Sequence, residues 1–167
     1  MIDLSPPAAR ALLAHVTAID ALDDDAAVEL YARVLWGCLT EPGDGIAGAF
    51  IQSVGAPDAL NRLATGSSVA VDGVRSREMA AARARWMPRL VPHVGREALR
   101  LAAASGVRLL TPASDAWPVA LDDLGVHAPL CLWMRGDPAA LDPATRVAVV
   151  GARAATAYGD HVAVALA

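Results

Sequence analysis

Residues 147–159, with the sequence V-A-V-V-G-A-R-A-A-T-A-Y-G, decide the fold. The first four are apolar, mostly β-branched and without alternation, which is typical of a strand buried on both faces in a parallel sheet. Gly151 follows at once and allows a sharp turn and the close approach of a phosphate. Thr156 is placed to cap the helix that follows, with Tyr158 and Gly159 in its first turn.

A strand, a glycine turn and a helix N-terminus together form an anion site. The first free N–H groups and the positive end of the helix dipole point to one place. Arg153 lies in this turn, and its guanidinium is suited to a phosphodiester. A dinucleotide fingerprint would need glycine at 153 and 156, and a P-loop would need a Gly-Lys-Ser/Thr ending. A tight turn with a solvated arginine explains the same pattern, so both interpretations stay open at this point.

The same residues resemble a known family. The pattern V-A-V-V-G-A-R-x-x-T-x-Y-G is similar to the opening of the Rossmann-like domain of the DNA-processing protein A (DprA) family, in which a strand runs into G-[ST]-R-x-x-[ST]-x-Y-G. Further matches occur in order upstream: Arg108-Leu-Leu-Thr-Pro, Asp115-Ala-Trp117-Pro118, Leu121-Asp-Asp-Leu124, Pro129-Leu-Cys-Leu-Trp133-Met-Arg135-Gly136 and Asp137-Pro-Ala-Ala-Leu141. The resemblance is close over 108–167 and looser through Glu41-Pro-Gly-Asp44 and 55–66. Ala152 departs from the family, which more often has Ser or Thr there.

The resemblance implies a cytoplasmic protein of DNA uptake (natural transformation) and recombination. Such a protein binds and protects single-stranded DNA and helps to load the RecA recombinase, without catalytic chemistry, cofactor or metal. The full-length family forms a homodimer. Carried onto this sequence, the DNA phosphate-binding residues are Gly151, Arg153, Thr156, Tyr158 and Gly159. Gly151 would let the backbone approach, Arg153 would contact a phosphate, and Thr156 would cap the helix.

An enzyme of another class is the alternative. A Rossmann-like phosphoribohydrolase of the lysine-decarboxylase-like group, which cleaves nucleoside monophosphates, would share the strand and the glycine turn. That group needs a downstream P-G-G-x-G-T-x-x-E motif, and the chain ends before the motif would appear. The helical N-terminal part and the D-x-W-P segment favour the DprA family. A dehydrogenase would need the missing glycines and a ribose-binding acid.

Start and stop signals predict an α/β fold with a helical N-terminal part. We expect a small helical, sterile-alpha-motif-like (SAM-like) domain over residues 1–66, an Arg-rich helical connector over 67–106 and the beginning of a Rossmann-like domain over 107–167. The expected helices are 8–19, 26–39, 46–54, 57–66, 78–89, 96–105 and 117–124, and the expected strands are 107–110, 130–134 and 147–150. Because a βαβ unit needs about 30 residues or more, we expect a truncated Rossmann-like domain and hence a fragment.

The composition narrows the class of protein. Apolar residues make up 55% of the 167, so disorder is not expected. No apolar run approaches the roughly 20 residues of a membrane span, and the N-terminus lacks the basic start of a signal peptide, so a cytoplasmic location is expected. Cys38 and Cys131 are expected to be reduced core residues, and the four histidines share no metal-ligand spacing with them.

The net charge of −4 is unevenly distributed. Nine arginines gather in the middle of the chain, at 62, 75, 77, 83, 85, 89, 96, 100 and 108. They form a candidate surface for phosphates, although solvated helix faces explain them as well and are the preferred interpretation.

Several other patterns have a functional and a structural interpretation. Trp117 and Trp133 could stack on bases of single-stranded DNA, but their apolar surroundings favour core packing. Helix capping or solvation explains Asp115, Asp122 and Asp123 better than acid–base chemistry does. Val54-Gly55-Ala56-Pro57 has one glycine where a DNA-binding helix-hairpin-helix wants two. A structural or partner-binding role is therefore preferred for the N-terminal part.

Overall fold

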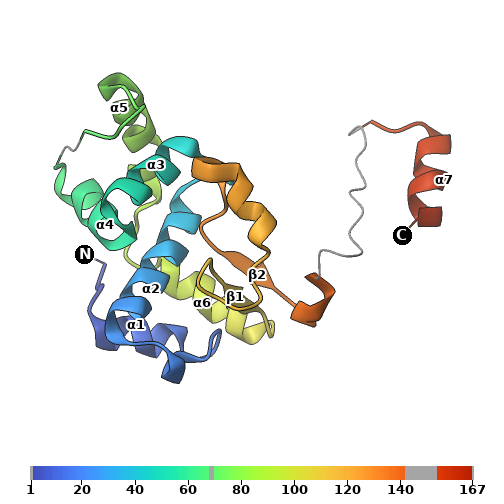
Figure 1. Cartoon of the computed structure of the whole chain (residues 1–167), viewed down its shortest axis with the longest axis horizontal. Helices are drawn as coiled ribbons and strands as arrows, with labels where there is room; N and C mark the ends of the chain where they lie inside the picture. Colours follow the sequence, from blue (N-terminus) through green and yellow to red (C-terminus); the bar gives the residue numbers. More distant parts are fainter. Residues whose placement is uncertain (1, 68–69, 142–153, 167) are drawn as a thin grey trace.

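The computed structural model describes residues 2–67, 70–141 and 154–166, and helices dominate them (Figure 1). The α-helices are α1 (Pro6–Leu13), α2 (Asp24–Leu39), α3 (Gly45–Val54), α4 (Ala56–Thr65), α5 (Ser76–Trp86), α6 (Val94–Ala104) and α7 (Ala157–Leu166). The 3-10 segments are η1 (Ile19–Ala21), η2 (Met87–Arg89), η3 (Val119–His127) and η4 (Pro138–Leu141). Strands β1 (Arg108–Leu110) and β2 (Leu132–Met134) form an antiparallel sheet in which Leu109 lies opposite Trp133. A helical part followed by the start of an α/β part is confirmed.

Helix α2 is the central helix of the core. It packs against α1, α4 and α6. Asp23 caps it, because its carboxylate accepts the N–H of Ala26 at 2.8 Å. Trp36 is fully buried, donates its indole N–H to the carbonyl of Ala56 at 3.1 Å and meets the rings of Phe50 and Trp86 edge-on, with centroids 6.1 and 5.2 Å away. This aromatic cluster joins α2, α3 and α5.

Glycine allows two of the closest helix contacts. A Cβ at Gly48 in α3 would lie 1.9 Å from the carbonyl oxygen of Val126 in η3, so only glycine lets η3 lie on α3 at this distance. A Cβ at Gly95 in α6 would lie 2.6 Å from Leu35 Cδ2 of α2. Because neither glycine has a side chain, η3 can pack closely on α3, and α6 can pack closely on α2.

The hydrophobic core is continuous across the predicted domain boundaries. Leu13, Leu99 and Leu109 belong to the same buried cluster, although they come from the three predicted units. The N–H of Leu109 in β1 also donates to the carbonyl of Val16 at 2.9 Å. The division at residues 66 and 106 stays a prediction about sequence units, while α1 to β1 share one core.

The first helix is shorter than predicted. It ends at Leu13 instead of residue 19, because Val16 is buried and directs its carbonyl to Leu109 of β1 instead of into a further helical turn. Ser5 takes the N-cap position without a side-chain capping bond. The next two residues are prolines, which have no N–H to donate to its hydroxyl.

The other predicted elements lie close to the observed ones. The predicted helix 117–124 is the 3-10 segment η3, interrupted at Gly125, where φ is 56°. The predicted strand 130–134 is shorter, at Leu132–Met134. The predicted strand 147–150 lies outside the described residues.

Candidate nucleic-acid site

Thr156 is the N-cap of α7, as predicted. Its Oγ1 accepts the N–H of Gly159 at 3.2 Å, and its carbonyl accepts the N–H of Asp160 at 3.0 Å. A helix start has four N–H groups without an intrahelical partner, and Thr156 satisfies one of them. The ring of Tyr158 is 77% exposed. Gly151 and Arg153, two of the five predicted phosphate-binding residues, lie outside the described residues.

Within the described part of the chain, neither backbone conformation nor packing requires glycine at position 159. It is absent from the described glycines with positive φ. A Cβ there would lie 3.5 Å from Ala155 Cβ and 3.7 Å from Thr156 Oγ1, which are ordinary contacts. Alanine is the better helix former, so the glycine at this position lowers helix stability without a packing benefit from these residues.

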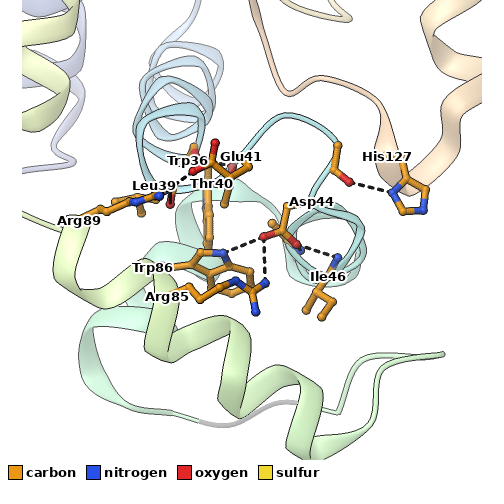
Figure 2. Close-up of polar contacts among 12 residues, drawn as sticks. Trp36, Leu39, Thr40, Glu41, Asp44, Ile46, Arg85, Trp86, Arg89 and His127 are labelled. Atoms are coloured by element: carbon orange, nitrogen blue, oxygen red, sulfur yellow. Dashed lines mark hydrogen bonds and ion pairs between the residues drawn. The ribbon is translucent and has the colours of Figure 1, made fainter. Parts of the chain in front are cut away.

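The 41–44 loop (Glu41-Pro-Gly-Asp44) makes contacts that join five elements, and Figure 2 shows the side chains that hold it. Asp44 caps α3, since its Oδ1 accepts the N–H groups of Ile46 and Ala47, both at 3.2 Å. Its Oδ2 accepts the indole N–H of Trp86 at 3.0 Å and lies 3.4 Å from Arg85 Nη2. One carboxylate therefore starts α3 and fixes the end of α5.

Two more residues, Arg89 and His127, complete the network around the 41–44 loop (Figure 2). Arg89 in η2 pairs with Glu41 at 2.6 Å and donates to the carbonyl of Leu39 at 3.1 Å, at the end of α2. His127 Nδ1 and the carbonyl of Gly43 form a 2.9 Å hydrogen bond from η3. The loop is therefore a structural junction of α2, α3, α5, η2 and η3, which the sequence did not reveal.

The α3–α4 hairpin is occupied by a carboxylate of the chain itself. Gly55 joins the two helices with φ at 84°. The N–H of Ala56, at the start of α4, donates to Glu29 Oε2 at 3.3 Å, and Glu29 Oε1 accepts from Arg33 at 2.8 Å. A carboxylate at this helix start repels a phosphate, so the hairpin favours the structural role over helix-hairpin-helix DNA binding.

Most of the clustered arginines have partners among the described residues. Ion pairs join Arg62 to Asp58, Arg75 to Glu78, Arg85 to Asp44, Arg89 to Glu41 and Arg100 to Glu97. Hydrogen bonding to Arg75 lowers the pKa of Glu78, and hydrogen bonding to Arg100 lowers the pKa of Glu97. Arg83 and Arg108 donate to backbone carbonyls. The middle of the chain therefore resembles solvated helix faces more than a continuous phosphate surface.

The two tryptophans differ in their surroundings. Trp117 is 6% exposed and donates its indole N–H to Asp122 at 3.0 Å, which confirms its core packing and gives Asp122 a structural role. Trp133 is 42% exposed, so the prediction that it packs in the core is wrong. Among the described strands β2 pairs only with β1, and no further described strand covers its outer edge.

The two cysteines are free thiols, and both are half-buried. Burial raises the pKa of Cys131 to about 11 and also raises the pKa of Cys38, so both are poor nucleophiles near neutral pH. Within residues 2–67, 70–141 and 154–166, no group of three His, Cys, Asp or Glu side chains is arranged to hold a metal ion. Among the described helices, none has the length and apolar character needed to cross a membrane.

The comparison with known families identifies the C-terminal part. The family model described as DNA recombination-mediator protein A matches residues 108–167, which include β1, β2 and α7. Through this segment the chain is similar to the DprA family. The predicted family resemblance is thereby confirmed, and the segment that carries it contains the capped start of α7.

Curated relatives agree with this assignment. Two proteins described as "Putative DNA processing protein DprA", from Mycobacterium tuberculosis strains CDC 1551 / Oshkosh and ATCC 25618 / H37Rv, are each 48% identical over 81 residues. The match covers 41% of this chain and 21% of each relative. The chain thus matches about a fifth of the length of these DprA relatives. No solved structure matches the chain.

Proposed function

We propose that this chain acts in DNA uptake and recombination by binding single-stranded DNA through the turn at residues 151–159. The bound strand would be shielded from nucleases and made available for RecA loading, without a catalytic step. The observation that supports this proposal is the Thr156-capped start of α7, which lies inside the segment matched by the DprA family model. A homodimer of the full-length protein and a cytoplasmic location are part of the same proposal.

The chemistry of the turn fits a phosphodiester. The start of α7 offers unpaired N–H groups and the positive end of its dipole. Arg153 adds a guanidinium that can donate two parallel hydrogen bonds to phosphate oxygens. No close contact among the described residues requires glycine at 159. Because Gly159 has no side chain, the backbone of the first turn of α7 stays accessible to a strand of DNA. Such a site reads the backbone, so we expect little preference for base sequence.

Fluorescence anisotropy with labelled single-stranded and double-stranded oligonucleotides over a salt series tests the proposal. We expect single-strand-selective binding that weakens as salt rises. Arg153→Ala should weaken binding equally across base sequences and reduce the salt slope by about one ion. Arg77→Ala is the matched control, because Arg77 is exposed on α5 and forms no ion pair among the described residues. Equal binding by wild type and Arg153→Ala would contradict the assigned role.

A separate assay tests the RecA part of the proposal. Filament formation by RecA on an oligonucleotide already coated with single-strand-binding protein should be faster when the chain is added, and Arg153→Ala should remove most of the gain. Nucleoside monophosphates are the counter-test for the alternative enzyme. Release of ribose 5-phosphate by the chain, together with no DNA binding, would favour the phosphoribohydrolase.

A further inference from the structure

Trp133 has a partly exposed side chain at the surface of the described structure. Its side chain is 42% exposed, although Leu109, directly opposite it in the sheet, is buried. The indole forms one wall of a pocket of about 160 Å³, which the 41–44 loop and Cys131 also line. A half-exposed aromatic ring beside a small pocket has the geometry of a platform on which a flat ring can stack.

Positive charge lies at the end of the same strand. Arg135 comes two residues after Trp133, is exposed and forms no ion pair among the described residues. Arg108 lies opposite Met134 in the sheet, on the other face from Trp133, and its Nη2 donates to the carbonyl of Gly136 at 2.9 Å, so its guanidinium is held just beyond the end of β2. An arginine one to three residues from a stacking ring can contact the phosphate beside the stacked base.

The acids near this end of β2 do not cancel that charge fully. Asp137 follows Gly136, and its Oδ1 accepts the N–H of Ala139 at 2.9 Å. Glu41 and Asp44 line the pocket, but Arg89 pairs with Glu41 at 2.6 Å and Arg85 lies 3.4 Å from Asp44. Near the end of β2, two arginines therefore stand against one acid, Asp137, that has no arginine partner among the described residues, and this local charge balance favours an anionic ligand.

We propose that Trp133 is a stacking platform for a base of single-stranded DNA and that Arg135 and Arg108 contact the neighbouring phosphates. The inference rests on the proposed function and adds to it a second contact point, on β2 instead of at the start of α7. A π-face is common to all four bases, so this contact also tolerates any sequence.

A cycle of base removal and side-chain removal isolates the stacking. Wild type should bind oligothymidylate at least about five-fold more tightly than an abasic strand of the same length. Trp133→Ala should lose that difference, and Trp133→Phe should restore most of it. Leu101→Ala is the control, because Leu101 is 52% exposed on α6 and away from the pocket. An unchanged preference for bases in Trp133→Ala would overturn the inference.

Tryptophan fluorescence gives a second readout. Trp36, Trp86 and Trp117 are buried, so stacking should quench the emission of Trp133, and Trp133→Phe should abolish the quenching by oligothymidylate. Arg135→Gln should reduce the salt slope by about one ion, whereas Trp133→Ala should leave the slope unchanged.

These variants separate the two proposals. If Arg153→Ala weakens binding while Trp133→Ala changes neither affinity nor quenching, the platform is wrong and the phosphate turn stands. If Trp133→Ala weakens binding and Arg153→Ala does not, the platform stands alone. If wild type binds no single-stranded DNA even at low salt, both are wrong.

Discussion

The indole nitrogen of Trp86 lies 3.0 Å from Oδ2 of Asp44, 42 residues earlier in the chain. The other oxygen of the same carboxylate caps α3. The Asp44 side chain is only 12% exposed, so water replaces these bonds poorly if the carboxylate is removed. The start of one helix and the end of another therefore depend on a single side chain.

Asp44→Ala should destabilise the fold by about 2–4 kcal/mol, because it removes an N-cap and leaves a buried indole N–H without an acceptor. Urea unfolding followed by tryptophan fluorescence measures the change. Asp58→Ala is the control, since the exposed Asp58–Arg62 pair within α4 contributes about 0.5 kcal/mol or less. Similar losses of unfolding free energy for the two variants would show that Asp44 does not hold α3 and α5 together.

Gly48→Ala should separate η3 from α3, because the new Cβ would lie 1.9 Å from the Val126 carbonyl oxygen. We expect a loss of about 1–3 kcal/mol or more in unfolding free energy. Gly37→Ala is the matched control within α2. Its Cβ would lie 3.5 Å from Cys131 Sγ, an ordinary contact, and alanine favours the helix. A stable Gly48→Ala variant would contradict the close packing of η3.

Stability should fall in alkaline solution because of Cys131. Burial raises its pKa from 9.0 to about 11, so between these values the unfolded chain loses this proton and the folded chain keeps it. Unfolding therefore becomes easier as pH rises from about 9 to 11, by roughly 2–3 kcal/mol in total.

Urea midpoints measured at several pH values, with Cys131→Ala for comparison, test this. The variant should lose less stability over that range. Some loss should remain, because burial also raises the pKa of Cys38 and Tyr31. Parallel pH profiles would show that the Cys131 thiol has no role in the alkaline loss.

Gly159→Ala should strengthen α7 by a few tenths to about 1 kcal/mol, because alanine is the better helix former and its Cβ meets only ordinary contacts. If DNA approaches the first turn of α7, the same variant should bind single-stranded DNA more weakly. Thermal unfolding and anisotropy titration together check both effects. A more stable variant with unchanged DNA affinity would remove Gly159 from the proposed site.

The sequence predicts best those helices whose first turn is capped by a residue next to it in the sequence. Helices α2 and α3 begin within two residues of the predicted positions, since Asp23 and Asp44 cap them. The cap of α7 was predictable for the same reason, because Thr156 and Gly159 are three residues apart. Local hydrogen bonds of this kind need no knowledge of the tertiary fold.

Contacts between distant residues account for what the sequence did not predict. The first helix ends early because Val16 bonds to Leu109, far along the chain. The exposure of Trp133 depends on which strands cover β2, and its apolar neighbours in sequence carry no information on that. Glu29 of α2 likewise accepts the N–H of Ala56 at the start of α4, 27 residues along the chain, and the local sequence of the α3–α4 hairpin gives no indication of this contact.

The hydrogen bond from Leu109 to Val16 shows that the family segment and the folding unit differ in extent. A recombinant protein that began at Arg108 would match the family from its first residue. It would also place Leu109, which now packs in the helical core, in water near its N-terminus, and leave β1 without the Val16 carbonyl. Such a truncated protein would expose an unpaired strand edge, and we expect it to aggregate, so a soluble version of the segment matched by the family model should include α1, α2 and α6.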